Sequence, residues 1–399
     1  MKEKNILDLS SVEIEEHLLR DTSYCNFKLP EYFSFKNIIN DLHSKKINTN
    51  DWKEYNYLLS DVKSKKWFFD NINYHIFNNK DWEYSWRLLQ LIHPVVYVGL
   101  VHLITEENNW REIVFRFYEF QKNNKIIVCS SIPIVEDIKN NHTEKQIINW
   151  FETIEQESIW LSLEYKYLFH TDIVDCYGSL YTHSIPWALH WKEDAKKRKK
   201  DEDLLWNQID YLFQYMNYWQ TNWIPQGNLV SDIVAELVLW YIDSEVEEEL
   251  KPLNNKEVKI LRYRDDYRIF VNNIELWKEV LKSLTKVLIK FWMRISSEKT
   301  KLNKDVILWS IKKDKIYHLL EFNFHRNYQK QLLLIKILAD EYPNSWSLSK
   351  ELGKFYNRIY NFNKKFNEPK ILIAITVDIL YKNPKIYPIW MSIIAKICS

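Results

Sequence analysis

Two adjacent aspartates, Asp265 and Asp266, lie between two short strand-like runs, Val258–Tyr263 and Tyr267–Val271. Short apolar runs on either side of a charged turn predict a β-hairpin with the aspartates at its tip. Carboxylates this close repel one another unless a cation neutralises them, and magnesium prefers carboxylate oxygens together with substrate phosphates. An isolated Asp-Asp pair is usually only a solvated turn, so a metal site needs support from other parts of the chain.

Two further elements provide that support. Asp172 stands at the end of the apolar run Tyr165–Ile173, and a third carboxylate there would allow two Mg²⁺ ions to clamp the oxygens of an in-line phosphoryl displacement. Pro225-Gln226-Gly227 precedes Ser231 and a helical pattern. Such a turn brings backbone close to a base pair, and the start of a helix favours phosphate. The order and spacing of the three elements therefore indicate chemistry on a nucleotide.

The elements that must position these residues change in character along the chain. Helical spacing of apolar residues predicts helices at 12–19, 51–69, 95–105, 232–240 and 274–291, and over almost everything after 328. Strands are predicted at 113–117 and 126–131 as well as at the three runs already named, and 193–203 is predicted to be a charged loop. The fold class is therefore α+β, with a helical first part, a mixed core and a helical tail.

The composition is that of an ordinary globular protein. A net charge of +1 gives no sign of a protein that covers nucleic acid non-specifically, but it is compatible with a local basic groove. The cysteines lack CxxC or metal spacing and predict reduced thiols: Cys25, Cys129, Cys176 and Cys398. The start of the chain has no signal-peptide pattern, and no apolar run is long enough to span a bilayer, so we expect a cytoplasmic protein without a membrane partner.

Taken together, the motifs resemble those of reverse transcriptases. The matches are Asp172 with Tyr177 for motif A, Pro225-Gln226-Gly227 with Ser231 for motif B, Tyr263-Arg264-Asp265-Asp266 for the YxDD box of motif C, and Lys299 within Ser297–Thr300 for motif D. Arg87 stands where the arginine of the fingers is expected, although Arg87-Leu88-Leu89 replaces the Arg-Pro-Leu of many relatives. The resemblance covers roughly residues 20 to 350.

This resemblance implies a right-hand polymerase with helical fingers, an antiparallel-sheet palm and an α-helical thumb. The implied domains are 1–165 for the fingers, with a short β element, 166–320 for the palm and 321–399 for the thumb. Asp172, Asp265 and Asp266 would hold two Mg²⁺ ions and be catalytic, together with Lys299 near the departing pyrophosphate. Arg87 would bind the triphosphate, Tyr177 would reject a ribose 2′-hydroxyl, and Gln226, Gly227 and Ser231 would shape the nucleotide pocket.

Two segments narrow the resemblance to bacterial defence-associated reverse transcriptases, including the abortive-infection group. They are 177–189, with the sequence YGSLYTHSIPWAL, and 24–33, with the sequence YCNFKLPEYF. The implied function is RNA-directed DNA synthesis from dNTPs in antiphage defence, with a noncoding RNA as template and DNA as product. A second reverse transcriptase, as in systems that pair two polymerases, or a homo-oligomer is a further possible partner.

Two alternatives to this function stay open. The first is template-independent, protein-primed DNA synthesis, for which Tyr24 is the candidate priming residue. The competing role for Tyr24 is that of an aromatic anchor that packs with Tyr32 and Phe33. The second alternative is a catalytically silent scaffold that binds nucleic acid or a partner polymerase, and the intact set of aspartates argues against it.

Several tryptophans stand where such relatives carry glycine. The chain has 18 tryptophans and only 4 glycines, and the positions concerned are Trp191, Trp206, Trp219, Trp223, Trp240, Trp292, Trp309 and Trp346. Glycine at turns supplies positive φ or close backbone approach, which tryptophan does poorly. We hypothesise that the gene reads UGA as glycine and that the printed sequence translates it as tryptophan. The alternative is real tryptophans that stack on bases or fill a core.

Overall fold

The fold comes from a computed structural model that describes residues 5–27, 29, 32–45, 72–79, 86–135, 150–199, 201, 204–252, 257–312, 328–362, 366 and 369–398. Its contacts divide the chain into two compact units. The first contains Met1–Phe27, Tyr32–Ile76 and Leu89–Ser310, and the second contains Lys28–Glu31, Phe77–Leu88 and Ile311–Ser399. The predicted helix at 51–69 lies outside the described residues.

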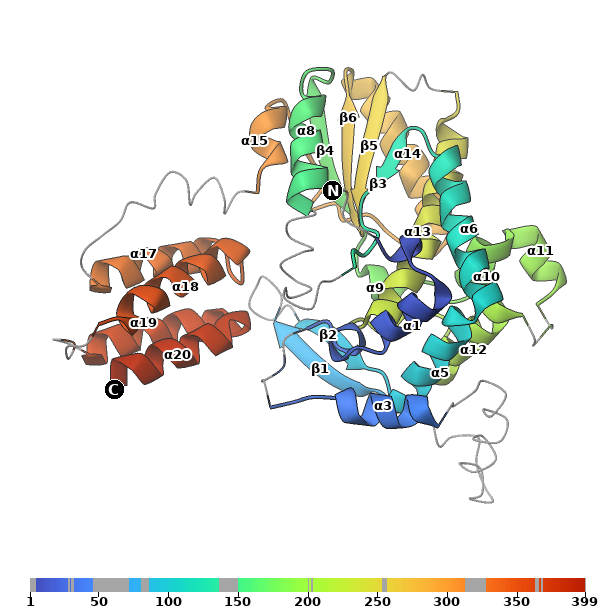
Figure 1. The fold of residues 1–399 in the computed structure, drawn as a ribbon. Coiled ribbons are helices and arrows are strands. Elements are labelled where there is room, and N and C mark those ends of the chain that lie inside the picture. The colour runs from blue at the N-terminus through green and yellow to red at the C-terminus, as the bar shows by residue number, and fades with distance from the viewer. Residues whose placement is uncertain are drawn as a thin grey trace. The chain divides into compact units, whose positions relative to one another are not determined.

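The centre of the first unit is a five-stranded sheet with the order β3-β5-β6-β4-β7 (Figure 1). Its strands are β3 (Ile127–Cys129), β4 (Tyr167–Asp172), β5 (Val258–Tyr263), β6 (Asp266–Val271) and β7 (Lys301–Asn303). The predicted hairpin is confirmed, since β5 and β6 pair in antiparallel fashion from Val258↔Val271 to Tyr263↔Asp266. Strand β4 pairs antiparallel with β6 and β7, while the edge strand β3 runs parallel to β5.

Both faces of this sheet are apolar, which explains why its strands read as continuous apolar runs. Successive residues of a strand point to opposite faces. Phe169 therefore enters the main core, where it stacks on Trp277 with ring centroids 4.2 Å apart. Its neighbour Leu168 joins a smaller core on the other face with Phe270.

The helices on the two faces account for these two cores (Figure 1). On the main-core side lie α13 (Leu229–Leu250) and α14 (Ile274–Lys290), and on the other side lie η2 (Trp150–Glu155), α8 (Gln156–Leu161) and α15 (Val306–Ser310). Helix α13 is buried on nearly every side over its first four turns, as expected for a helix enclosed by other elements.

Further helices belong to the first unit. They are η1 (Ile6–Asp8), α1 (Ser11–Leu18), α2 (Asp21–Tyr24), α3 (Lys36–Ser44), α5 (Pro94–Thr105), α6 (Glu107–Asn123), α9 (Cys176–Ser179), α10 (Ser184–His190), α11 (Lys192–Lys197) and α12 (Leu205–Tyr215). A two-stranded sheet of β1 (Tyr74–Asn79) and β2 (Trp86–Leu91) precedes α5.

Two sequence-based expectations in this region are wrong. Residues 113–117 belong to helix α6 and not to a strand. Their β-branched and aromatic types favour a strand, but Trp110, Ile113, Phe117 and Phe120 are all buried on one helical face, and this packing outweighs intrinsic propensity. The charged segment 193–203 begins within helix α11 rather than as a loop.

In the second unit, the residues that the structure describes from 328 onward form four helices and a 3₁₀ turn. They are α17 (Tyr328–Glu341), α18 (Trp346–Tyr360), α19 (Pro369–Lys382), η3 (Pro384–Ile386) and α20 (Tyr387–Cys398), and the expected helical tail is thereby confirmed. Leu332, Leu352, Ile379 and Ile393 belong to its own hydrophobic core. No helix among the described residues has both the length and the apolar character needed to cross a membrane.

Four of the eight suspect tryptophans have backbone conformations that favour glycine. The φ angles are 62° at Trp191, 58° at Trp219, 107° at Trp223 and 62° at Trp292. Left-handed conformations cost an L-residue roughly 1–2 kcal/mol. Among the described tryptophans these four alone have positive φ. The backbone conformation therefore favours glycine at four of the eight suspect positions.

Candidate active site

The three aspartates that the sequence singles out meet at the ends of β4, β5 and β6. Asp172, the last residue of β4, is the Cα partner of Asp266, the first residue of β6, and directly opposed residues of antiparallel strands have Cα atoms roughly 4.5–5.5 Å apart. Asp265 lies in the two-residue turn of the hairpin, and its carbonyl oxygen accepts a hydrogen bond from the amide of Ile173 at 3.1 Å. The turn is thereby joined to β4.

Negative charge at this point is only partly balanced. Lys299 makes an ion pair with Oδ2 of Asp172. Burial alone would lower the pKa of Lys299, but the neighbouring aspartates outweigh burial and raise it. Desolvation raises the pKa of Asp266, although its side chain keeps contact with solvent, and the charges of Asp265 and Asp172 raise it further. Like charges this close make ionisation unfavourable without additional cations.

The donor set fits divalent metal ions. Oδ1 of Asp172 is buried and accepts no hydrogen bond from any described residue. A buried carboxylate oxygen without a partner is costly, and hard cations such as Mg²⁺ are bound by carboxylate oxygens of this kind. Asp172, Asp265 and Asp266 are the residues that would hold the ions.

Asp232, on the first turn of α13, joins three other parts of the site. It accepts a hydrogen bond from the hydroxyl of Tyr177 (2.5 Å) and another from the amide of Asn26 (3.0 Å), and it forms an ion pair with Arg264 (3.2 Å). Arg264 occupies the variable position of the YxDD box and has a positive φ of 56°. Strained backbone of this sort persists where surrounding contacts hold it, so Asp232 fixes both Tyr177 and the turn.

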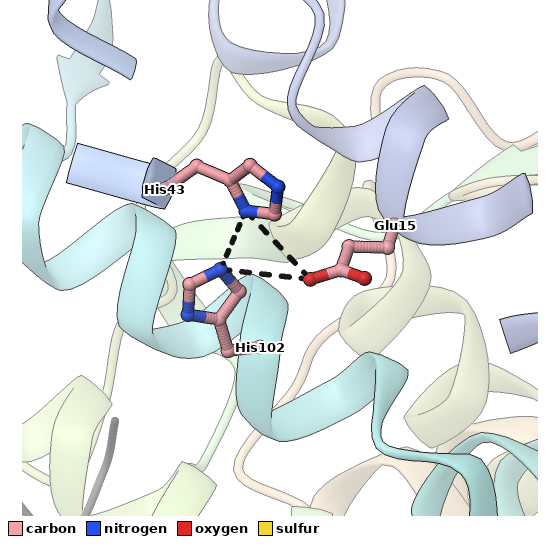
Figure 2. A group of neighbouring side chains, drawn as sticks. All are labelled: Glu15, His43 and His102. Carbon is pink, nitrogen blue, oxygen red and sulfur yellow. Dashed lines mark hydrogen bonds and ion pairs between the residues drawn. The ribbon is translucent and has the colours of Figure 1, made fainter. Parts of the chain in front are cut away.

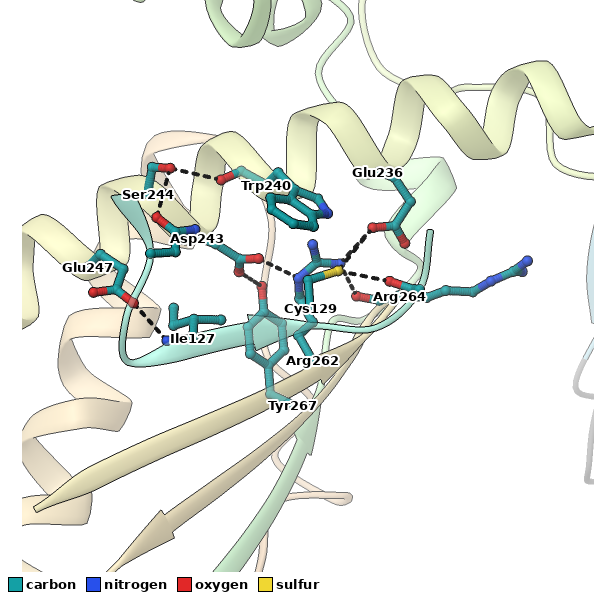
Figure 3. Close-up of polar contacts among 12 residues, drawn as sticks. Ile127, Cys129, Glu236, Trp240, Asp243, Ser244, Glu247, Arg262, Arg264 and Tyr267 are labelled. Carbon is teal, nitrogen blue, oxygen red and sulfur yellow. Dashed lines mark hydrogen bonds and ion pairs between the residues drawn. The ribbon is translucent and has the colours of Figure 1, made fainter. Parts of the chain in front are cut away.

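A second, fully buried network anchors strand β5 to α13 (Figure 3). Arg262 is 0% exposed and forms ion pairs with Asp243 (2.6 Å) and Glu236 (3.1 Å), and it donates to the carbonyl of Arg264 (2.9 Å). The hydroxyl of Tyr267 donates to the other oxygen of Asp243. Burial raises the pKa of Asp243 to about 6 although Arg262 opposes the shift.

These two networks were not predicted from the sequence. A signal was present, since Asp232, Glu236 and Asp243 recur at helical spacing within the largely apolar first four turns of α13. Acidic residues on a buried helical face need cationic partners. The sequence alone does not reveal that Arg262 and Arg264 are those partners.

The Pro225-Gln226-Gly227 turn lies between β2 and the segment after α2. The carbonyl of Gln226 accepts from the amide of Gln90 at 2.8 Å, and the carbonyl of Gly227 accepts from the amide of Asn26 at 3.0 Å. Gly227 has φ +130°, and a Cβ there would lie 2.7 Å from the ring of Phe27. Glycine is therefore required here.

Ser231 follows this turn in the first turn of α13. It is fully buried, and its Oγ has no hydrogen-bond partner among the described residues. Its amide donates to the side chain of Asn228, which caps the helix. Contact between Ser231 and a substrate remains a prediction.

Arg87 and Tyr24 are the two remaining predicted site residues. Arg87 is exposed on β2 in the second unit, and its role in binding a triphosphate stays a prediction. Tyr24 is only 2% exposed, donates a hydrogen bond to the carbonyl of Ile92 at 2.5 Å and packs edge-on against Phe35 and Tyr97. The structure thus favours the role of an aromatic anchor for Tyr24, but its ring partners are Phe35 and Tyr97 and not the expected Tyr32 and Phe33.

One protein-family model matches the chain. A family model described as reverse transcriptase (RNA-dependent DNA polymerase) matches residues 104–324, which is more than half of the chain. No curated protein matches the chain.

Similar solved structures include two telomerases. Apo telomerase from Candida tropicalis has 13% sequence identity and a TM-score of 0.40, over 92% of this chain and 72% of its own. Telomerase from Candida albicans in complex with a TWJ fragment of telomeric RNA has 11% identity and a TM-score of 0.39, over 87% of this chain and 66% of its own.

Proposed function

This chain belongs to the reverse transcriptase family and is an RNA-directed DNA polymerase, and we propose that it transfers nucleotides from dNTPs by two-metal catalysis on a noncoding RNA in antiphage defence. The observation that carries the catalytic part is the meeting of Asp172, Asp265 and Asp266 at the strand ends, with one buried carboxylate oxygen of Asp172 left without a partner.

Each residue of the site has a task that its contacts support. When bound, two Mg²⁺ ions would activate the attacking 3′-hydroxyl and neutralise charge on the phosphates, and the three aspartates would hold them. Lys299 already contacts Asp172, so its ammonium group lies within reach of the same charges and would stabilise the departing pyrophosphate or protonate it.

Tyr177 would select the sugar. Asp232 holds its hydroxyl at 2.5 Å, which restricts the ring to one position. A fixed aromatic ring under the incoming nucleotide would leave no room for a 2′-hydroxyl, so deoxynucleotides would be preferred. Gln226 and Gly227 would form the wall next to the base pair.

The defence role rests on the sequence segments 24–33 and 177–189, which resemble defence-associated reverse transcriptases. With this role go a noncoding RNA template, a DNA product, a cytoplasmic location, and a second reverse transcriptase or a second copy of the chain as partner. The domain division into fingers (1–165), palm (166–320) and thumb (321–399) belongs to the same proposal.

Protein-primed, template-independent synthesis is the second candidate function. Burial of Tyr24 and its hydrogen bond to Ile92 count against this residue as the primer, because a priming hydroxyl must reach the α-phosphate of a nucleotide. Burial also raises the pKa of this phenol, which makes it a poorer nucleophile. A silent scaffold would leave the buried, unpartnered oxygen of Asp172 without a purpose.

The test is incorporation of labelled dNTPs by the purified protein, with and without prior RNase treatment. The proposal predicts magnesium-dependent incorporation that RNase abolishes and that Asp265→Asn and Asp266→Asn each abolish. Asp194→Asn is the matched control, because this aspartate is exposed on α11 and forms an ion pair with the exposed Lys197; its activity should equal that of the wild type.

Other outcomes would redirect the assignment. Activity that survives RNase would contradict RNA templating and support template-independent synthesis. Activity that survives both Asp→Asn changes would refute the assigned site. Absence of activity in a folded wild-type protein would favour the scaffold or a missing partner.

A further inference from the structure

Three helices of the first unit bring two histidines and a glutamate together, on elements that carry none of the aspartates (Figure 2). Glu15 comes from α1, His43 from α3 and His102 from α5. Nδ1 of His43 lies 2.9 Å from Nε2 of His102. Oε1 of Glu15 lies 3.8 Å from the former nitrogen and 3.5 Å from the latter.

These separations match the edges of a metal coordination polyhedron. Zn²⁺ binds imidazole nitrogen and carboxylate oxygen at about 2.0–2.2 Å in tetrahedral geometry, so neighbouring donor atoms lie about 3.3–3.5 Å apart. The three observed distances lie on either side of this value. One cation placed among the three atoms would therefore need only shifts of a few tenths of an ångström in each side chain.

The chemistry of the donor set separates this place from the aspartate site. Imidazole favours zinc and its transition-metal neighbours, whereas magnesium prefers oxygen ligands alone. The side chains of Glu15, His43 and His102 are 30%, 45% and 17% exposed. The site is thus half-buried, so solvent reaches its side chains and metal could exchange with it.

Helix α3 is the element that would gain most from such a cross-link. Among its nine residues Ile39 is buried and Leu42 is half-buried against the main core, so two side chains account for most of its apolar packing. A bond from His43 through a cation to α1 and α5 would add to these core contacts. Helix α5 begins three residues after β2, and the cross-link would therefore stiffen the region around that sheet.

We propose that Glu15, His43 and His102 bind one Zn²⁺ ion that fastens α3 to α1 and α5. In the metal-free protein one imidazole N–H donates to the other ring. Metal binding replaces this hydrogen bond. The donating ring then changes tautomer, so that its proton moves to the ring nitrogen that does not coordinate and both coordinating nitrogens are unprotonated.

The experiment uses the full chain, purified without a polyhistidine tag, stripped with a chelator and then exchanged into metal-free buffer. Zinc is added at equimolar concentration, unbound metal is removed by gel filtration, and zinc per chain is measured by mass spectrometry of the element. Thermal unfolding with and without zinc is recorded in parallel. Co²⁺ substitution provides a spectroscopic readout, because tetrahedral cobalt sites absorb visible light strongly.

The expected result is one zinc per chain, a higher melting temperature with zinc, and visible cobalt absorption. His43→Gln should lose all three, and Glu15→Gln should bind zinc at least tenfold more weakly. Glu16→Gln is the matched control, because this neighbour on α1 is exposed and outside the cluster; it should bind as the wild type does.

His43 is the most exposed of the three, so its substitution should leave the fold intact, which circular dichroism checks. Absence of stoichiometric zinc in the wild type would overturn the proposal, and so would binding that His43→Gln and Glu15→Gln leave unchanged. None of these readouts depends on polymerase activity, so the proposal fails or stands independently of the aspartate site.

Discussion

Replacement of Trp292 tests whether the backbone of this chain is built for glycine. Trp292 follows helix α14 at the position where a Schellman motif places its left-handed residue. The amide of Met293 donates to the carbonyl of Leu288 at 3.0 Å, and that of Trp292 donates to Ile289 at 3.1 Å. This is the hydrogen-bond pattern of that motif, in which glycine is the usual left-handed residue.

The expected difference in the free energy of unfolding follows from comparing glycine with alanine at this one position. Both substitutions remove the same indole, which is already 76% exposed, so the loss of its contacts cancels. Alanine keeps the Cβ strain of φ 62°, which is about 1–2 kcal/mol. Glycine has more conformational freedom in the unfolded chain, which lowers the free energy of unfolding of the glycine variant by about 0.4–1 kcal/mol. Trp292→Gly should therefore be more stable than Trp292→Ala by about 0.5–1 kcal/mol.

Urea unfolding followed by circular dichroism measures this difference. The control is the same pair of substitutions at Lys282, an exposed residue in the middle of α14. There the order must invert, since glycine is about 1 kcal/mol worse than alanine within a helix. If alanine equals or exceeds glycine at Trp292, the left-handed conformation is absent and the argument for glycine at such positions fails.

Three further predictions concern the active site. Arg262→Ala should lower the free energy of unfolding by about 3–5 kcal/mol in urea unfolding, because Asp243 would be a buried charge without a partner; a loss below about 1 kcal/mol would contradict the network. Asp232→Ala should increase ribonucleotide incorporation relative to deoxyribonucleotide several-fold in primer extension, since Tyr177 loses the acceptor of its hydroxyl; unchanged sugar selectivity would exclude this positioning role. The Mg²⁺ concentration for half-maximal activity should rise as pH falls from about 8 to about 6, because the raised pKa of Asp266 lets protons compete with metal; a requirement independent of pH would refute it.

The local elements of the catalytic sheet were accessible to sequence reasoning because their signals are local. Asp265 and Asp266 stand between two apolar runs, and a short charged turn between such runs favours a hairpin. Asp172 ends a third run, and it pairs with Asp266 as the motif order implies. Residues 113–117 show the limit of the same reasoning, since an apolar segment of five residues is compatible with a strand and with one face of a helix.

Long-range polar contacts account for what the sequence did not predict. Arg262 and Asp243 are 19 positions apart, and Asn26 reaches Asp232 across 206 positions. Pairing of such residues depends on how α13 packs against the sheet, which no local pattern determines. The burial of Tyr24 is of the same kind, because its acceptor on Ile92 lies 68 positions further along the chain.

The four suspect tryptophans without positive φ divide into two groups, and the division bears on the UGA hypothesis. Trp206 and Trp240 are buried, and their indole N–H groups find no hydrogen-bond acceptor among the described residues. A buried donor without a partner costs roughly 1–3 kcal/mol, so tryptophan is unfavourable there for a reason other than backbone strain. Trp277 shares this defect and is not a suspect position, so the defect supports the hypothesis only together with the sequence pattern.

Trp309 and Trp346 have neither a positive φ nor a buried indole N–H group without an acceptor. Trp346 is half-exposed at the start of α18, with the ammonium group of Lys350 over its ring at 4.9 Å. A reassigned codon would affect every suspect position regardless of local strain, whereas selection for real tryptophans would avoid the strained ones. UGA at Trp191, Trp219, Trp223 and Trp292 and at both unstrained positions is therefore the outcome that the hypothesis predicts. UGG at all eight suspect positions would refute it.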